Sequence, residues 1–327
     1  MNGSGDCMTM LTPLGRSTLM VPRLGVGAMT WGEPTGLARW HPAKLAYGGA
    51  HGFDEEKRAL EASIAGGVTL FDTAAMYSGG AAERRLGELA QEKAVLIATK
   101  FPGSFFFRTA DLPKELDASL ARLQRTSVEL YQHHFPTNAK AIPRLMELMA
   151  DAVAAGKVRA VGVSNYSAQQ MRLAHAVLAD RGIALASNQV EYSLLHRQPE
   201  INGVLESCRE LGVTLIAYQP LAGGALTGKY AAGARPAGVF RRFMKNFRGS
   251  GLEAIAPVVA LLREIGARYG KSPAQVALRW LIENEHILPI PGAKNSRQAA
   301  DNAGALIFHL TPAEIEALDR ATLAWRG

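Results

Sequence analysis

The chain has 327 residues, of which 48% are hydrophobic and 20% charged, and its formal net charge is +7. This is the composition of an ordinary globular protein, long enough for one large barrel-like domain or two smaller ones. No apolar run approaches the roughly 18 to 20 residues of a transmembrane helix, and two cysteines, Cys7 and Cys208, are too few for a disulfide framework or a metal cluster.

The first predicted element is a β-hairpin. The segment MLTPLGRSTLMV (10–21) places Gly15 and Arg16 at a turn, and we expect it to cap the bottom of the domain that follows. Residues 1–13 are predicted as an N-terminal tail and residues 14–327 as a single domain. Because the first residues lack a basic start and an apolar signal core, we expect no export and a cytoplasmic location, unless a transit segment for the chloroplast or another organelle has been removed.

From residue 23 onward, short apolar or β-branched runs alternate with tracts of helical periodicity. The runs that predict strands are 23–29, 67–72, 94–100, 127–133, 158–164, 183–189, 212–218 and 286–292. The tracts that predict helices are 55–66, 81–91, 112–123, 141–156, 168–182, 198–212, 251–270, 272–285 and 311–325. Alternating strands and helices indicate parallel strands joined by right-handed crossovers.

Eight such units in about 300 residues predict an α/β fold of the (β/α)8 TIM-barrel type. An open, doubly wound sheet is the main alternative. That fold usually has a Gly-rich fingerprint after its first strand, and GVGAMTWG (25–32) lacks the GxGxxG spacing. The barrel is therefore favoured.

Polar residues end most of the predicted strands, at the edge where barrels place their active sites. They are Asp72 with Tyr77 on the next loop, Lys100, His133 and His134, Ser164 and Asn165, Asn188 and Gln189, and Tyr218 and Gln219. Each alone has a structural explanation, such as a helix cap or a solvated rim charge. Together they predict one polar mouth.

Aspartate, tyrosine, lysine and histidine in one mouth can move a proton to or from a substrate oxygen. A nearby ammonium lowers the pKa of a tyrosine, so Lys100 would assist Tyr77 while Asp72 keeps Lys100 charged and oriented. A histidine would donate a hydrogen bond to a carbonyl oxygen as negative charge builds there. Strand side chains alternate, so only one of His133 and His134 can face the mouth, and parity alone does not say which. We expect no metal site, because adjacent histidines do not readily bind one ion and no carboxylate partner pattern is present.

Two segments allow more than one interpretation. The tract GVFRRFMKNFRG (238–249) interleaves aromatic and basic residues, which suits nucleic acid, an amphipathic helix with a packed Phe face, or a basic flap near a phosphorylated small molecule. We favour the flap and expect no nucleic-acid or membrane partner. In residues 33–54 and just before them, Trp31, Trp40 and Tyr47 either line an apolar substrate pocket or belong to a packed loop.

These motifs resemble those of the aldo-keto reductase family over about residues 14 to 325. The resemblance is carried by FDTAAMYSGGAAERRLGEL (71–89), VLIATKF (95–101), ELYQHHFP (129–136), GKVRAVGVSN (156–165), ASNQVEYS (186–193), YQPLAGGALTGKY (218–230) and PIPGAKNSRQAADN (289–302). The chain is most similar to a plant and cyanobacterial branch that includes chloroplast oxidoreductases and pyridoxal reductase.

The resemblance implies a barrel enzyme that transfers hydride between NADPH (NADP+) and a small-molecule carbonyl, as a monomer or weak oligomer. Tyr77 would be the general acid, tuned by Lys100 and Asp72. The spacing to the proline selects His134 as the residue that orients the carbonyl. The substrate would be pyridoxal or another aromatic or aliphatic aldehyde. The alternative is a cofactor-sensing regulatory subunit with little catalysis.

The resemblance also implies a cofactor site. Tyr218 would stack on the nicotinamide, and Ser164, Asn165 and Gln189 would bind its carboxamide. The other expected cofactor residues are Thr30, Trp31, Gln219, Pro220, Leu221, Gly223, Lys229, Arg241, Gly292, Lys294, Gln298, Asp301 and Asn302. Many relatives have an arginine where Gln298 stands, so we expect Lys294, with Arg297 or the 241–242 pair, to bind the 2′-phosphate. A second departure is Ala82, where many relatives have a serine.

Overall fold

A computed structural model of the chain describes residues 11–33, 51–103, 108–136, 138–230, 245–248 and 250–327. Its centre is an eight-stranded sheet in which each strand pairs in parallel with the next one along the chain. The strands are β3 Gly25–Gly27, β4 Leu70–Asp72, β5 Leu96–Phe101, β6 Val128–His133, β7 Val158–Ser164, β8 Leu185–Glu191, β9 Thr214–Tyr218 and β10 Ile287–Pro289. The sheet curls until Gly27 forms a parallel bridge with Gly292. The predicted barrel is confirmed, and each strand overlaps a predicted run.

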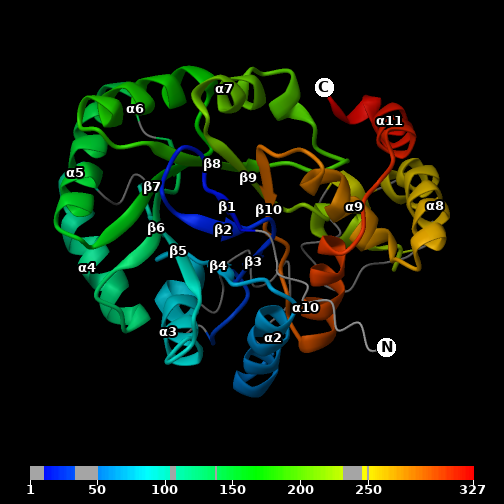
Figure 1. Ribbon diagram of the computed structural model, residues 1–327, viewed down its shortest axis with the longest axis horizontal. Helices are drawn as coiled ribbons and strands as arrows, with labels where there is room; N and C mark the ends of the chain where they lie inside the picture. Colours follow the sequence, from blue (N-terminus) through cyan, green and yellow to red (C-terminus); the bar gives the residue numbers. More distant parts are fainter. Residues whose placement is uncertain (1–10, 34–50, 104–107, 137, 231–244, 249) are drawn as a thin grey trace, which may run out of the picture.

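Helices surround the strands as an outer ring (Figure 1). They are α2 Phe53–Ala65, α3 Ala81–Leu89, α4 Leu112–Leu123, α5 Ile142–Ala154, α6 Ala168–Asp180, α7 Val204–Leu211, α8 Gly251–Tyr269, α9 Pro273–Ile282, α10 Ser296–Ala303 and α11 Pro312–Ala321. Several begin at the signal Ser/Thr-x-x-Glu/Gln, in which the first side chain caps a backbone N–H and the last one reaches back. Ser167, Ser272 and Thr311 make such capping boxes at α6, α9 and α11.

The periodicity did not predict α10 as a helix. Its buried residues are Ala299, Asn302 and Ala303, which form too small an apolar face to produce a clear pattern. A local signal was present, because the Asn295 side chain caps the helix by accepting from Gln298 N at 3.0 Å.

The two faces of the strands divide the core into an interior and a shell. The barrel interior is filled by Leu70, Ala98, Leu130, Ala160, Ala186, Ile216, Leu288 and Ile290. Their sequence neighbours, such as Phe71 and Tyr131, face the helices and belong to the larger outer cluster. This alternation explains why the strand ends present one set of side chains inward and the other outward.

The predicted N-terminal hairpin closes the bottom of the barrel and consists of β1 Leu11–Pro13 and β2 Met20–Pro22. Because β1 begins at Leu11, the hairpin starts before the predicted boundary at residue 14. Gly15 at its turn has φ +56°, and a Cβ there would lie 2.5 Å from the carbonyl oxygen of Ala186, so only glycine fits. Gly15 N also donates to Thr214 Oγ1 at 2.7 Å, which joins the hairpin to the start of β9.

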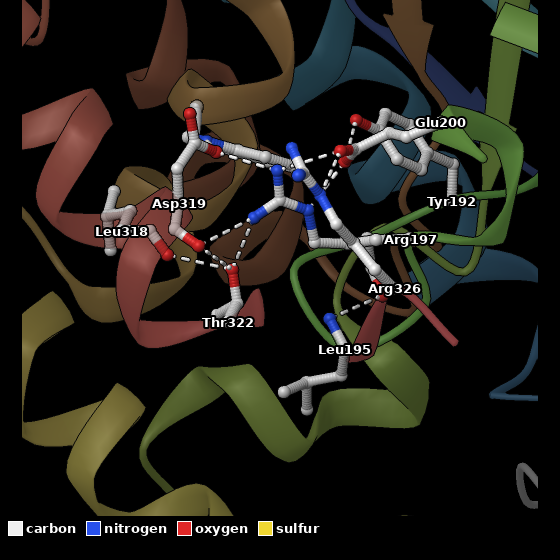
Figure 2. Close-up of polar contacts among 10 residues, drawn as sticks. Tyr192, Leu195, Arg197, Glu200, Leu318, Asp319, Thr322 and Arg326 are labelled. Atoms are coloured by element: carbon white, nitrogen blue, oxygen red, sulfur yellow. Dashed lines mark hydrogen bonds and ion pairs between the residues drawn. The ribbon is translucent and has the colours of Figure 1, made fainter. Parts of the chain in front are cut away.

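The C-terminal helix α11 is fixed to the loop after β8 by a buried arginine (Figure 2). Arg197 donates from Nε and Nη2 to both carboxylate oxygens of Glu200, at 2.5 and 2.9 Å. Its Nη1 donates to the Asp319 carbonyl and to Thr322 Oγ1, and its Nη2 forms an ion pair with the Asp319 carboxylate. The Arg326 side chain also donates to Glu200, at 2.8 Å. We refer to Arg197, Glu200, Asp319, Thr322 and Arg326 as the C-terminal lock.

Within the described part of the chain, no helix is long and apolar enough to cross a membrane, and no three or more His, Cys, Asp or Glu residues gather as a metal site would require. Cys208 is a buried free thiol, and burial raises its pKa to about 12.

Candidate active site

Asp72 lies at the centre of a buried polar network at the carboxyl ends of the strands. Its Oδ1 accepts from Lys100 Nζ at 2.5 Å, and its Oδ2 accepts from the amides of Gln132 and Gln189 at 3.1 and 2.8 Å. Lys100 also donates to the Thr73 carbonyl at 2.8 Å. These contacts come from β4, β5, β6 and β8, so the barrel itself brings the carboxylate and the ammonium together.

The residue Gln132 was not predicted as part of the site. It shares strand parity with His134 and therefore points inward, where its amide nitrogen donates to Asp72 and its oxygen faces Ser187 and Gln189 at 3.4 Å. The parity was readable from the sequence, but its contact with Asp72 depends on two strands that are not adjacent in the barrel.

The tyrosine of the site is positioned by a sharp turn after β4. Tyr77 is followed by Ser78 and Gly79 with φ of +54° and +64°, a left-handed path that turns the chain back toward the mouth. The Tyr77 hydroxyl lies 3.3 Å from Lys100 Nζ, and that nitrogen lies 4.8 Å from the centre of the tyrosine ring.

Burial and charge act in opposite directions on this pair. Burial raises the pKa of Tyr77, and the opposing effect of the Lys100 ammonium does not cancel the rise. Burial alone would lower the pKa of Lys100, but Asp72 and Tyr77 raise it above its usual value. The Lys100 ammonium acts to lower the pKa of Tyr77, but the net direction is upward, so Tyr77 is protonated and Lys100 is charged near neutral pH.

The two histidines at the end of β6 point in opposite directions. His134 lines the cavity with its ring edge-on to Tyr77, at a centroid distance of 5.6 Å. His133 faces outward, where its Nδ1 lies 2.7 Å from the Tyr166 hydroxyl and its ring stacks on Phe101. The structure thus places the residue selected by the proline spacing at the mouth.

His134 is a neutral imidazole in this environment. Burial, the Lys100 ammonium and His133 together lower the pKa of His134 to about 2. A neutral imidazole can donate an N–H hydrogen bond, but it cannot supply a proton from a charged form. His134 is therefore suited to donate an N–H hydrogen bond into the cavity, but not to supply a proton.

Amide and hydroxyl groups of β7, β8 and β9 line the wall next to the histidine. Asn165, in the left-handed region at φ +60°, donates to the His134 carbonyl at 3.1 Å and accepts from the Tyr218 hydroxyl at 3.0 Å. The Ser164 hydroxyl donates to the Gln189 carbonyl at 2.8 Å. These contacts hold the strand ends in register and present polar groups to the cavity.

A cavity of about 640 Å³ opens over these groups. Of the predicted site residues, those lining it are Thr30, Asp72, Tyr77, His134, Ser164, Asn165, Gln189, Tyr218, Gln219, Pro220, Leu221, Gly223, Lys229, Gly292, Lys294, Gln298, Asp301 and Asn302. A larger cavity, of about 1300 Å³, lies at the hairpin end of the barrel, away from the tyrosine and lysine.

Some predicted residues are placed elsewhere, and some lining residues were not predicted. Lys100 is fully buried beneath the cavity wall, and Trp31 is a core residue that packs on Phe71 instead of facing the cavity. Arg241, with Trp40 and Tyr47, lies outside the described residues. The lining residues that sequence reasoning missed are Gly27, Met29, Met76, Phe135, Gly224, Thr227, Tyr230, Ala274, Ile290 and Pro291. For Phe135 the signal was its position next to His134, on which its ring stacks.

The sequence and the barrel fold are shared with known proteins. The sequence profile of the Aldo/keto reductase family matches residues 23–322, so the chain belongs to the aldo/keto reductase family. It is 35% identical over 310 residues to the chloroplastic pyridoxal reductase of Arabidopsis thaliana, covering 90% of this chain and 81% of that protein. It is 33% identical over 273 residues to aldo-keto reductase yakc [NADP(+)] of Schizosaccharomyces pombe, covering 78% of each chain.

Solved structures agree with this assignment. The crystal structure of an aldo-keto reductase from Klebsiella pneumoniae in complex with NADPH matches with a TM-score of 0.73 at 27% identity, covering 95% of this chain and 94% of that one. These matches confirm the predicted family and the predicted enzyme class, an oxidoreductase. The predicted cofactor type, NADP(H), agrees with the names of the Schizosaccharomyces pombe relative and the Klebsiella pneumoniae structure.

Proposed function

We propose that this protein reduces an aldehyde or ketone to an alcohol with NADPH, and that Tyr77 is the general acid. The observation that carries the proposal is the chain of contacts from Asp72 through Lys100 to Tyr77, which ends at the cavity beside His134. A protonated phenol backed by a buried ammonium is a proton donor, and it has no evident purely structural purpose at the edge of a cavity.

The residues that line the cavity suit a nicotinamide dinucleotide. The amide and hydroxyl groups of Asn165 and Ser164 suit a carboxamide at one end, and Lys229 and Lys294 suit phosphate groups at the other. Gly223 and Gly224 have φ of +67° and +98°, so backbone N–H groups there can approach an anion without interference from a side chain.

When bound, NADPH supplies a hydride to the carbonyl carbon. Tyr77 gives its phenolic proton to the carbonyl oxygen, and the Lys100 ammonium, 3.3 Å from the phenol oxygen, stabilises the phenolate that remains. Asp72 and its two amide partners hold Lys100 in place. His134 donates an N–H hydrogen bond that strengthens as the oxygen gains charge.

We also propose that the substrate is pyridoxal or another aromatic or aliphatic aldehyde. The support is the 35% identity to the protein named pyridoxal reductase and the nonpolar side chains of Met29, Met76 and Phe135 in the cavity wall. These side chains offer a neutral, apolar surface to a carbonyl compound.

The test is an NADPH-oxidation screen over pyridoxal, aromatic aldehydes and short aliphatic aldehydes, with Tyr77→Phe beside the wild type. We expect the variant to bind NADPH normally and to lose about 10² or more in kcat, the scale of a positioned general acid. Tyr230→Phe, which removes the hydroxyl of another cavity residue, is the matched control and should keep its activity. A Tyr77→Phe variant with near wild-type kcat contradicts the assignment, and a wild type that never oxidises bound NADPH favours a regulatory subunit.

A further inference from the structure

The barrel is closed least completely between β3 and β10. Each other neighbouring pair of strands forms a ladder of at least three residue pairs. In the described residues, the two strands at this seam meet through the Gly27–Gly292 bridge and a hydrogen bond from Gly27 N to the Pro291 carbonyl at 3.0 Å. Gly27, Pro291 and Gly292 all line the cavity, so the seam lies directly under the candidate cofactor site.

Trp31 crosses this seam above the bridge. Its side chain is fully buried against Phe71, at a centroid distance of 5.9 Å, and its indole Nε1 donates to the Ala293 carbonyl at 2.8 Å. Ala293 stands between Gly292 and Lys294, and Trp31 directly follows Thr30; Gly292, Lys294 and Thr30 all line the cavity. One buried hydrogen bond therefore links the cavity-lining segment after β3 to the one after β10.

The backbone next to Trp31 is fixed by contacts with α2 and α3. The next residue, Gly32, donates its N–H to the fully buried carboxylate of Glu56, with both oxygens at 3.2 Å. Arg85 of α3 pairs with the same carboxylate. Gly32 has φ +71°, and a Cβ there would lie 2.2 Å from the Ala81 carbonyl oxygen, so the turn is fixed against α3. Trp31 thus extends from a rigid base.

The segment on the far side of the seam is held by α10. Asn302 donates to the Gly292 carbonyl at 3.3 Å, and the Gln298 side chain accepts from Lys294 N at 3.0 Å. On the β3 side, the Gly27–Gly292 bridge holds only the start of this segment, and the indole adds a bond one residue further on, at the Ala293 carbonyl. Without the indole, this buried carbonyl loses that donor, and the part of the segment beyond the bridge is held by α10.

We propose that Trp31 is a positioning residue that holds segment 292–294 in the geometry needed for the adenosine end of NADPH. This inference rests on the proposed NADPH binding. The sequence predicted that the Trp31 ring contacts the cofactor. Here Trp31 acts instead through its hydrogen bond to the Ala293 carbonyl. Ordering the segment before binding lowers the entropy that binding must remove, which is how preorganisation raises affinity.

The test uses Trp31→Phe, which keeps an aromatic ring and removes the N–H donor. By calorimetry we expect the Kd for NADPH and for 2′,5′-ADP, a probe of the adenosine end, to rise together by about 3- to 10-fold. The kcat at saturating NADPH should change less than about twofold, since the proton-donating groups are untouched. Trp280→Phe is the matched control, because Trp280 is buried on α9 and its indole donates to Asp319 of the C-terminal lock at 3.1 Å, and not to segment 292–294. It should leave both Kd values unchanged.

Equal Kd values for wild type and Trp31→Phe overturn the positioning role, as does an equal rise in Trp280→Phe. If Trp31→Phe does not fold, β-(3-benzothienyl)alanine placed at position 31 removes the N–H while keeping the bicyclic shape, and the same two Kd values decide. A wild type that binds neither NADPH nor 2′,5′-ADP overturns the proposed function itself, which distinguishes that failure from the failure of this inference.

Discussion

Replacing Arg197 with methionine removes the cation at the centre of the C-terminal lock (Figure 2). The side chain is 2% exposed and donates to Glu200, Asp319 and Thr322 at 2.5 to 2.9 Å. Methionine has a similar length but no charge, so the change leaves the 10% exposed Glu200 carboxylate without its bidentate partner. Leaving a buried carboxylate without its cation lowers the free energy of unfolding more than leaving an exposed one does.

The expected magnitude follows from these contacts. Removing one partner of a buried ion pair costs about 3 to 5 kcal/mol. Glu200 keeps hydrogen bonds from Tyr192 and Arg326 at 2.8 Å each, and Asp319 is partly exposed. We therefore expect the lower end, about 3 kcal/mol of unfolding free energy. For a chain of 327 residues, the usual unfolding entropy per residue converts this to a fall in Tm of about 4 °C.

The assay is the Tm at pH 7 of wild type, Arg197→Met and a control. Arg172→Met is the matched control, because Arg172 pairs with Glu210 on the surface, with both side chains nearly half exposed. Exposed pairs contribute at most about 1 kcal/mol, so the control should lose less than about 1.5 °C. Tm losses of equal size in the two variants would refute the reasoning that the lock is a buried ion pair.

The pH dependence adds a second check. Burial alone would raise the pKa of Glu200, but hydrogen bonds from Arg197 and Tyr192 outweigh burial and lower the pKa below its usual 4.5. A depressed carboxyl pKa contributes stability that is complete above 4.5 and is lost as the pH falls through the folded-state value. The Tm difference between wild type and Arg197→Met should therefore shrink below pH 4.5. A difference that grows there contradicts the sign.

Three further predictions concern the candidate site. His134→Ala should lower kcat/KM for carbonyl substrates. His133→Ala should lower the Tm and leave kcat/KM nearly intact. The reverse result would show that His133, and not His134, faces the cavity. Lys294→Ala should weaken the binding of NADPH by about 1 to 3 kcal/mol and barely change the binding of NADH. Equal weakening of both cofactors would show that Lys294 does not bind the 2′-phosphate. Burial lowers the pKa of His133 to about 3 and contributes to lowering that of His134 to about 2. The unfolded chain therefore binds more protons than the folded chain below pH 6.5. As the pH falls below 6.5, the free energy of unfolding should fall by about 1.4 kcal/mol per pH unit for each histidine. His133→Phe should remove one of these two contributions between pH 6.5 and 5, and an unchanged slope in that variant would contradict its burial as a neutral ring.

Most strand and helix positions could be predicted from the sequence, because their buried residues give it a hydrophobic periodicity. The run 158–164 predicted β7 at its observed bounds, because all its residues except Arg159 are buried and most of them are apolar. The helix α10 has no clear hydrophobic periodicity, because its side chains are small or polar and several of them line the cavity. A short helix with a small apolar face was recognisable only by its Asn295 cap.

The sequence likewise predicted one part of the candidate site, and the other part depended on the tertiary structure. Strand ends in a parallel barrel meet at one edge, so the sequence alone determined that Asp72, Lys100 and His134 lie near one another if the barrel forms. Strand parity limited the inward histidine to one of two, and the proline spacing of the family motif selected His134. The sequence did not determine that Gln132 would reach Asp72, because that contact joins strands that are not neighbours.

The sequence by itself thus determined the fold class, the family and the set of residue types at the mouth, because these depend on local pattern and chain order. Only the tertiary structure decided the direction of the Tyr77 pKa, the contact of Gln132 with Asp72, and the place of Trp31 in the seam between β3 and β10. The physical reason is that desolvation and contacts across a closed sheet both depend on atoms distant in the chain. Periodicity records whether a residue is buried, but not which partner it meets there.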